Sequence, residues 1–191
     1  MTTLSATDQN MRRAFRYLNK FMILMWRLGL GWMLNMWPSV GGRIMVIAHT
    51  GHKSGKRRLA PVNYAIVDGK LYCTAGFGRV AHWYRNIMAI PDIEVWLPDS
   101  RWYATAHDVS DDPDRLRLLR QVLIGSGKVA ALVGVDPATL SDEELAAKTG
   151  HYRLIYLQRT SPATGPGGPG DLSWIWPTTT LLLVLRCRRR G

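Results

Sequence analysis

The stretch RIMVIAHTGHKSGKRRLAPVNYAIV, residues 43–67, carries two strand patterns joined by a turn. The run 43–49 is apolar, rich in β-branched residues and bounded by glycines, which favours a strand buried on both faces. In 58–67, apolar and aromatic residues recur at every second position, which is typical of a strand with two unlike faces. Pro61 cannot donate a ladder hydrogen bond, so we expect a free edge or a bulge beside it.

Further strand and helix patterns follow along the chain. The sequence VDGKLYCTA predicts an Asp-Gly hairpin into a third strand over 70–75, which completes a meander. Strands are also expected in the hairpin 92–109, over 152–159 and over 178–186. Helices are expected over 7–36, after Gly76 and Gly78 with an end before Pro91, over 111–124 and over 141–148. The predicted class is mainly β with α (α+β): a small antiparallel β-barrel with an N-terminal helix and helices between its hairpins.

The length of 191 residues predicts a single domain, 1–191. Within it, 1–38 is expected to form an apolar, amphipathic N-terminal helix, and 186–191 a basic tail. The Gly/Pro-rich segment 160–177 predicts a surface loop whose far end is docked by Trp174 and Trp176.

A net charge of +11 attracts polyanions of any kind, including nucleic acid, anionic lipid and phosphorylated cofactors. A nucleic-acid binder is disfavoured, because the bases are not interleaved with aromatic residues in a recognisable module. Cys73 and Cys187 have no metal-site spacing and indicate a reducing, cytoplasmic compartment, and no signal-peptide pattern is present. No metal site is expected, since the remaining candidates are scattered histidines and acidic residues at a helix start: His49, His107, His151, Asp111, Asp112 and Asp114.

The apolar stretch 21–37 allows three interpretations. It is shorter than a spanning helix and is interrupted by Arg27. It could pack on its own domain, lie in a membrane interface beside basic residues, or cross the bilayer. The basic residues are Arg12, Arg13, Arg16 and Lys20. Peripheral contact with the inner face of the membrane is therefore an open expectation.

The turn GHKSGKRR, 51–58, has two interpretations. Gly51, Ser54 and Gly55 could turn successive backbone N–H groups toward one side and form an anion-binding nest. The adjacent bases would add charges suited to phosphate or carboxylate oxygens: Lys53, Lys56, Arg57 and Arg58. The alternative is an ordinary glycine turn with solvated bases. The spacing matches neither a Walker loop nor a dinucleotide-binding motif.

Four elements in order resemble the deazaflavin-dependent nitroreductase and quinone reductase family. They are GHKSGKRR, Pro61, DGKLYCTAGFG and HWYRNIMAIPDIEV, within about residues 40–110. The resemblance implies a split β-barrel related to the pyridoxamine-oxidase-like flavin-binding proteins, an oxidoreductase activity and the cofactor F420. The C-terminal third of the chain hardly matches the family pattern.

The resemblance also implies roles for particular residues. Those implied to hold the phosphate and acidic tail, or to shape the adjoining strand, are His52, Lys53, Ser54, Lys56, Arg58 and Pro61. Those implied to lie against the ring are Ala75, Gly76, Phe77 and Gly78, with Trp83 and Asn86 anchoring the next helix. His52 stands where the family usually has arginine.

The implied reaction is hydride transfer from the reduced deazaflavin to a quinone, a nitro-aromatic or an enone. Tyr64, Tyr72 and His82 are catalytic candidates that could bind an acceptor oxygen or deliver a proton, although packing is the commoner role of such residues. An FMN-dependent oxidoreductase on the same barrel, a non-catalytic lipid- or haem-binding barrel and a homodimer remain alternatives to be tested.

Overall fold

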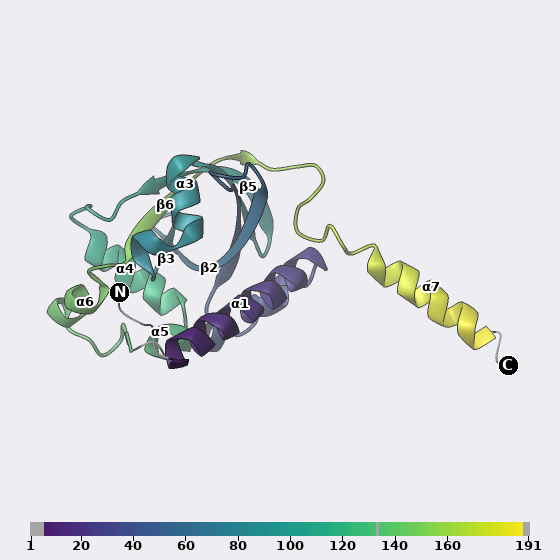
Figure 1. Cartoon of the computed structure of the whole chain (residues 1–191), viewed down its shortest axis with the longest axis horizontal. Helices are drawn as coiled ribbons and strands as arrows, with labels where there is room; N and C mark the ends of the chain where they lie inside the picture. Colours follow the sequence, from purple (N-terminus) through teal and green to yellow (C-terminus); the bar gives the residue numbers. More distant parts are fainter. Residues whose placement is uncertain (1–5, 133, 189–191) are drawn as a thin grey trace.

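The computed structural model describes residues 6–132 and 134–188 and contains a closed antiparallel barrel (Figure 1). The strands follow the order β1-β2-β3-β6-β5-β4 around it. Their bounds are β1 Ile44–Thr50, β2 Arg57–Val67, β3 Lys70–Ala75, β4 Asp92–Leu97, β5 Ser100–Asp108 and β6 Arg153–Pro162. The predicted α+β class and antiparallel barrel are confirmed, with helices inserted between the β3–β4 and β5–β6 strand pairs.

The helices have bounds that differ in places from the sequence patterns. They are α1 Ala6–Arg27, η1 Gly31–Asn35, α2 Pro38–Gly41, η2 Gly78–Val80, α3 His82–Ala89, α4 Arg115–Gly125, α5 Lys128–Leu132, α6 Asp142–Thr149 and α7 Ile175–Arg188. Ser141 forms a capping box with Glu144 at the start of α6. The helix expected from 111 begins four residues later, at Arg115, after a turn in which Asp112 Oδ1 accepts the Asp114 N–H.

Along the strands, successive side chains alternate between the interior of the barrel and its outer face. Met45 and Ile47 of β1 point into the interior cluster, whereas Val46 and Ala48 pack outward against Trp26 and Trp96. Another outer face, formed by β2, β3 and β6, is covered by α4 and its neighbours. Side chains on both faces of β1 are therefore buried, one face in the interior of the barrel and the other beneath the N-terminal segment, as the sequence of β1 predicts.

Pro61 occupies the kind of position that its missing N–H requires. It pairs with Val46 of β1, while β3 pairs only with the later part of β2, from Tyr64 to Val67. The other edge of β2 is therefore unpaired with β3 at Pro61, which confirms the predicted free edge.

The N-terminal helix ends earlier than expected. A helix over 7–36 is wrong, because Gly29 has a φ of +80° and the chain turns sharply after Arg27. Gly31 then packs against Trp26 so closely that a Cβ would lie 2.3 Å from the indole ring. Trp26 is 2 % exposed, so α1 packs on its own barrel. In residues 6–132 and 134–188, no helix combines the length and apolar character needed to cross a membrane.

The strand expected over 178–186 is wrong, since this segment lies in α7. The six strands already close the barrel without this segment. The threonine hydroxyls of this segment donate to carbonyls one turn earlier, as Thr178 Oγ1 does to Trp174 and Thr180 Oγ1 to Trp176. The start of α7 is held near the end of α1, where Trp176 Nε1 donates to the carbonyl of Leu28, the residue after α1, at 3.0 Å.

One end of the barrel gathers most of the residues implicated by the sequence. Because neighbouring strands are antiparallel, β1, β3 and β5 end where β2, β4 and β6 begin. The turn after Thr50 and the glycine segment after Ala75 therefore lie at the same end. Helix α3 also lies there, and we call it the α3 end of the barrel (Figure 1).

Candidate functional site

The β1–β2 turn is closed by its own backbone. Gly51 donates to the Lys56 carbonyl at 2.9 Å, and the Gly51 carbonyl accepts the N–H groups of Ser54 and Gly55. The Lys56 N–H faces Ser54 Oγ at 3.4 Å. The nest is one of two interpretations of the turn, and the N–H groups of Gly51, Ser54, Gly55 and Lys56 do not form it, because they already have partners inside the turn.

Three exposed bases of the turn keep their charges available. Lys53, Lys56 and Arg58 are exposed. Across the residues that the structure describes, no carboxylate lies within ion-pair distance of any of the three. An anionic ligand could therefore contact them without breaking an ion pair.

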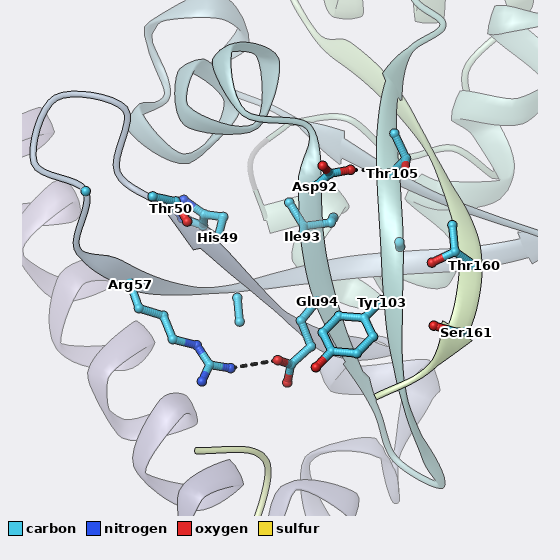
Figure 2. Close-up of a pocket in the computed structure, with 13 residues that line it drawn as sticks. His49, Thr50, Arg57, Asp92, Ile93, Glu94, Tyr103, Thr105, Thr160 and Ser161 are labelled. Carbon is cyan, nitrogen blue, oxygen red and sulfur yellow. Dashed lines mark hydrogen bonds and ion pairs between the residues drawn. The ribbon is translucent and has the colours of Figure 1, made fainter. Parts of the chain in front are cut away.

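Arg57 differs from its basic neighbours. Its guanidinium donates to Glu94 Oε2 at 2.9 Å (Figure 2). It also lies over the Trp96 ring, 5.8 Å from the centroid. The second carboxylate oxygen of Glu94 accepts from Arg101 Nε and Trp96 Nε1. Glu94 is 8 % exposed, so the two arginines neutralise a buried carboxylate. Arg57 is a structural residue and does not belong with the available bases.

The turn is tied to helix α3 through one asparagine. The amide oxygen of Asn86 accepts the His52 N–H at 3.2 Å and lies 2.6 Å from His52 Nδ1. An amide oxygen can only accept, so Nδ1 carries the proton in this contact. Asn86 is 9 % exposed and fixes the exposed turn from beneath.

The segment after β3 has one glycine that is structurally required and one that is not. Gly78 has a φ of +58°, and a Cβ there would lie 2.2 Å from the His151 carbonyl oxygen. A Cβ on Gly76 would meet only the Tyr152 ring, at 3.6 Å, which is an ordinary contact. Phe77 is 60 % exposed between them, and Ala75 is buried in the barrel.

Helix α3 places its sequence candidates differently. Trp83 packs against the barrel interior cluster, and Asn86 faces the turn. His82 is exposed at the first position of the helix, where its Nδ1 accepts from Arg85 at 3.0 Å.

Tyr64 and Tyr72 lie on opposite faces of the sheet. Tyr64 points into the barrel interior, and Tyr72 packs outward beneath α4 against Tyr156. Each is 7 % exposed, and burial raises the pKa of both phenols. These are the surroundings of packing residues, and the two hydroxyls do not converge on one acceptor.

His49 is a residue whose role at this end the sequence did not reveal. It is 5 % exposed, pairs in register with Arg58, and its Nδ1 is buried without a hydrogen-bond partner. Burial, together with the Arg58 charge, lowers the pKa of His49. The imidazole is thus held neutral beside one of the available bases.

A second network also escaped sequence reasoning. Tyr84 of α3 donates to Asp108 at the end of β5, and Asp108 also accepts from the N–H and hydroxyl of Ser110. Burial and this hydrogen bond raise the pKa of Tyr84 to about 12. Arg153 lies opposite Ala75 in the register, and its Nε is buried without a partner. The motif HWYRNI could have drawn attention to Tyr84, because it stands between Trp83 and Asn86.

A groove of about 560 Å³ runs along the outer face of β1, β4, β5 and β6 (Figure 2). Its wall includes Arg57, Glu94, Tyr103 and Thr105. The residues 75–78 do not line it. The groove therefore does not include the segment that the resemblance assigns to the ring.

The residues at the α3 end fit the anionic cofactor implied by the sequence. The exposed bases on a fixed turn suit phosphate and carboxylate groups, and Phe77 offers an exposed aromatic face at the same end. Lys53, Lys56 and Arg58 would contact the acidic groups, and the segment 75–78 would face the ring.

Comparisons with known proteins identify the family. The family model for F420H2-dependent quinone reductases matches residues 29–129, which include the turn, the glycine segment and α3. No curated protein matches the chain in sequence.

Similar solved structures include an F420H2-dependent reductase, which is 22% identical with a TM-score of 0.44 and covers 61% of this chain and 93% of its own. The haem storage protein HutZ from Vibrio cholerae is 13% identical with a TM-score of 0.44, covering 68% and 89%. A chain described as a domain-swapped dimer is 21% identical with a TM-score of 0.45, covering 81% and 99%.

The family match spans more than half of the chain and confirms the resemblance drawn from its motifs. The chain belongs to the F420H2-dependent quinone reductase family, a family of oxidoreductases whose cofactor is F420.

Proposed function

We propose that the protein binds F420 at the α3 end of the barrel and reduces a small electrophilic acceptor, with a quinone as the first candidate. The proposal depends on one observation: the β1–β2 turn carries three exposed bases that have no ion-pair partner among the described residues. Asn86 holds this turn in place, and the turn lies at the end of the barrel where residues 75–78 also lie. Nitro-aromatics and enones are further candidate acceptors of the same chemical class.

Reduced F420 supplies a hydride when bound, so the chain itself needs to position the cofactor and the acceptor. Lys53, Lys56 and Arg58 would hold the acidic end, since none of them forms an ion pair with a carboxylate in the described part of the chain. Asn86 and His52 would keep the turn in place, which limits the ordering cost of binding. Phe77 would shield one side of the site from water.

A direct experiment follows the oxidation of reduced F420 by absorbance, with menadione and a nitro-aromatic as separate acceptors. The proposal expects protein-dependent oxidation with at least one acceptor. Parallel titrations with oxidised F420, FMN and haemin determine which group binds. Tight binding of FMN or haemin without F420 binding would contradict the cofactor assignment for this chain.

We also propose that α1 contacts a membrane surface at its periphery. Tyr17, Phe21 and Leu24 recur at helical spacing and are 58%, 53% and 47% exposed. Arg16 and Lys20 are exposed on the same helix. An apolar stripe beside basic residues is typical of helices that lie in a membrane interface. A homodimer remains a prediction, which sedimentation equilibrium would test.

A further inference from the structure

Helix α7 projects away from the barrel (Figure 1). The segment before it is well anchored: Leu172 donates to the Arg27 carbonyl at 2.8 Å, and Arg27 donates to both oxygens of Asp171. Trp176 contributes the bond to Leu28. Beyond Trp176, the hydrogen bonds of the described side chains stay within the helix. The barrel therefore presents α7 to its surroundings from a fixed base.

The sequence of α7 does not suit a helix alone in water. It has 14 residues, and isolated helices of this length are marginally stable. Residues 181–185 are five successive apolar residues, a sequence pattern that differs from the single stripe of an amphipathic helix. Such a sequence favours an apolar environment, and α7 projects away from the barrel (Figure 1).

The charges of the segment favour an anionic environment. From Leu172 to Gly191 the sequence has four arginines and no acidic residue. A second copy of α7 would bring like charges together without offering carboxylates in return. A surface of anionic lipids offers an apolar layer and negative headgroups at the same place.

The length of α7 indicates whether the helix would cross such a bilayer or lie on it. Fourteen residues extend about 21 Å, which is less than the roughly 30 Å hydrocarbon core of a bilayer. Trp174 and Trp176 stand at the start of the helix and are 60% and 47% exposed, and tryptophan favours the level of the headgroups. Arg186 is exposed near the other end.

We propose that α7 lies in the interface of an anionic bilayer and anchors the protein there. Its apolar run would enter the acyl boundary, while Arg186 contacts the headgroups. This inference is independent of F420 binding and goes beyond the contact proposed for α1. Two contacts on one rigid protein would bind more tightly than either alone.

The test is sedimentation of the full chain with vesicles of equal parts phosphatidylcholine and phosphatidylglycerol. Arg186→Glu is the test variant, and Lys128→Glu is the matched control, because it makes the same charge change at an exposed base on α5. We expect Arg186→Glu to weaken binding about 10- to 30-fold, and Lys128→Glu less than about threefold. Vesicles of phosphatidylcholine alone should bind the wild type weakly.

A second measurement reports on α7 directly. Cys187 is exposed on α7, whereas Cys73 is fully buried and its thiol pKa is raised by burial, so a polarity-sensitive maleimide will label Cys187 selectively. The emission should shift to the blue when anionic vesicles are added.

Four outcomes would overturn the proposal: no vesicle binding, equal loss of binding in both variants, an unshifted probe on bound protein, or self-association that covers α7. Titration of each variant with F420 separates this failure from failure of the proposed function, since neither Arg186 nor Lys128 belongs to the cofactor site.

Discussion

Asn86 and His52, 34 positions apart in the sequence, join helix α3 to the β1–β2 turn through a single amide oxygen. That oxygen accepts the backbone N–H of His52 and contacts its ring nitrogen at 2.6 Å. The same helix is fixed at its first turn by the hydrogen bond from Tyr84 to Asp108. Helix α3 therefore connects the basic turn to the far side of the barrel end.

Replacing Asn86 should loosen the turn. We expect Asn86→Ala to lower the free energy of unfolding by about 0.5–1.5 kcal/mol, because it removes the part-buried hydrogen bond from the His52 N–H. F420 affinity should fall as well. His52→Ala keeps the backbone bond and should have a smaller effect on stability. Urea denaturation and F420 titration measure the two quantities. Equal stability of Asn86→Ala and the wild type would show that the bond does not hold the turn.

The two glycines after β3 should respond differently to an added methyl group. Gly78→Ala should destabilise the fold by at least about 1–2 kcal/mol, because of its positive φ and the close His151 carbonyl. Gly76→Ala should fold normally, since its Cβ would meet nothing closer than 3.6 Å. If the ring lies against this segment, Gly76→Ala should still weaken F420 binding. Unchanged affinity in a folded Gly76→Ala variant would place the ring elsewhere.

The buried carboxylate of Glu94 should be important for stability. Glu94→Gln removes the charge that compensates Arg57 and Arg101, and we expect a loss of about 2–4 kcal/mol in unfolding free energy. Arg57→Ala should cost less, because the Arg57 side chain is 43% exposed and the pair is screened by solvent. Chemical denaturation of the two variants tests this order. A larger loss for Arg57→Ala than for Glu94→Gln would contradict it.

His49 should make stability depend on pH. Its pKa is lowered in the folded state by burial and by Arg58, so the unfolded chain binds more protons as the pH falls. The stability that His49 contributes is present above the ordinary histidine pKa of about 6.5 and is lost as the pH falls toward the folded pKa. The melting temperature should fall between about pH 7.5 and pH 5, and His49→Gln should flatten this dependence. The same slope in His49→Gln would assign the effect to other groups.

Most of the barrel could be predicted because its signals are local. Alternation in β1 and β2, the Asp-Gly hairpin before β3 and the turn between β4 and β5 each depend on a few adjacent residues. The break after α1 could not be predicted in this way, since it depends on Gly31 meeting Trp26 in space. Helix α7 was predicted as a strand because β-branched threonines favour strands, whereas a closed barrel offers a seventh strand no partner.

The candidate site was predictable only in part. The motifs pointed to the turn, to 75–78 and to α3, and the strand register brings these together at one end. The sequence could not distinguish Arg57 from its neighbours, because its partner Glu94 is 37 positions away. It also gave no sign that His49 and Arg153 would be buried with unpaired nitrogens, which is a property of packing.

The most direct test of the central proposal is the F420 affinity of a Lys53→Ala and Arg58→Ala double variant, measured at low and at high salt. Lys70→Ala and Lys128→Ala together form the control, since they remove the same charge from exposed positions away from the α3 end. We predict a loss of about 10- to 100-fold in the double variant at low salt, shrinking as salt screens the exposed contacts, with the control near the wild type. Wild-type affinity in a folded double variant would contradict the proposal that the basic turn holds the acidic end of F420.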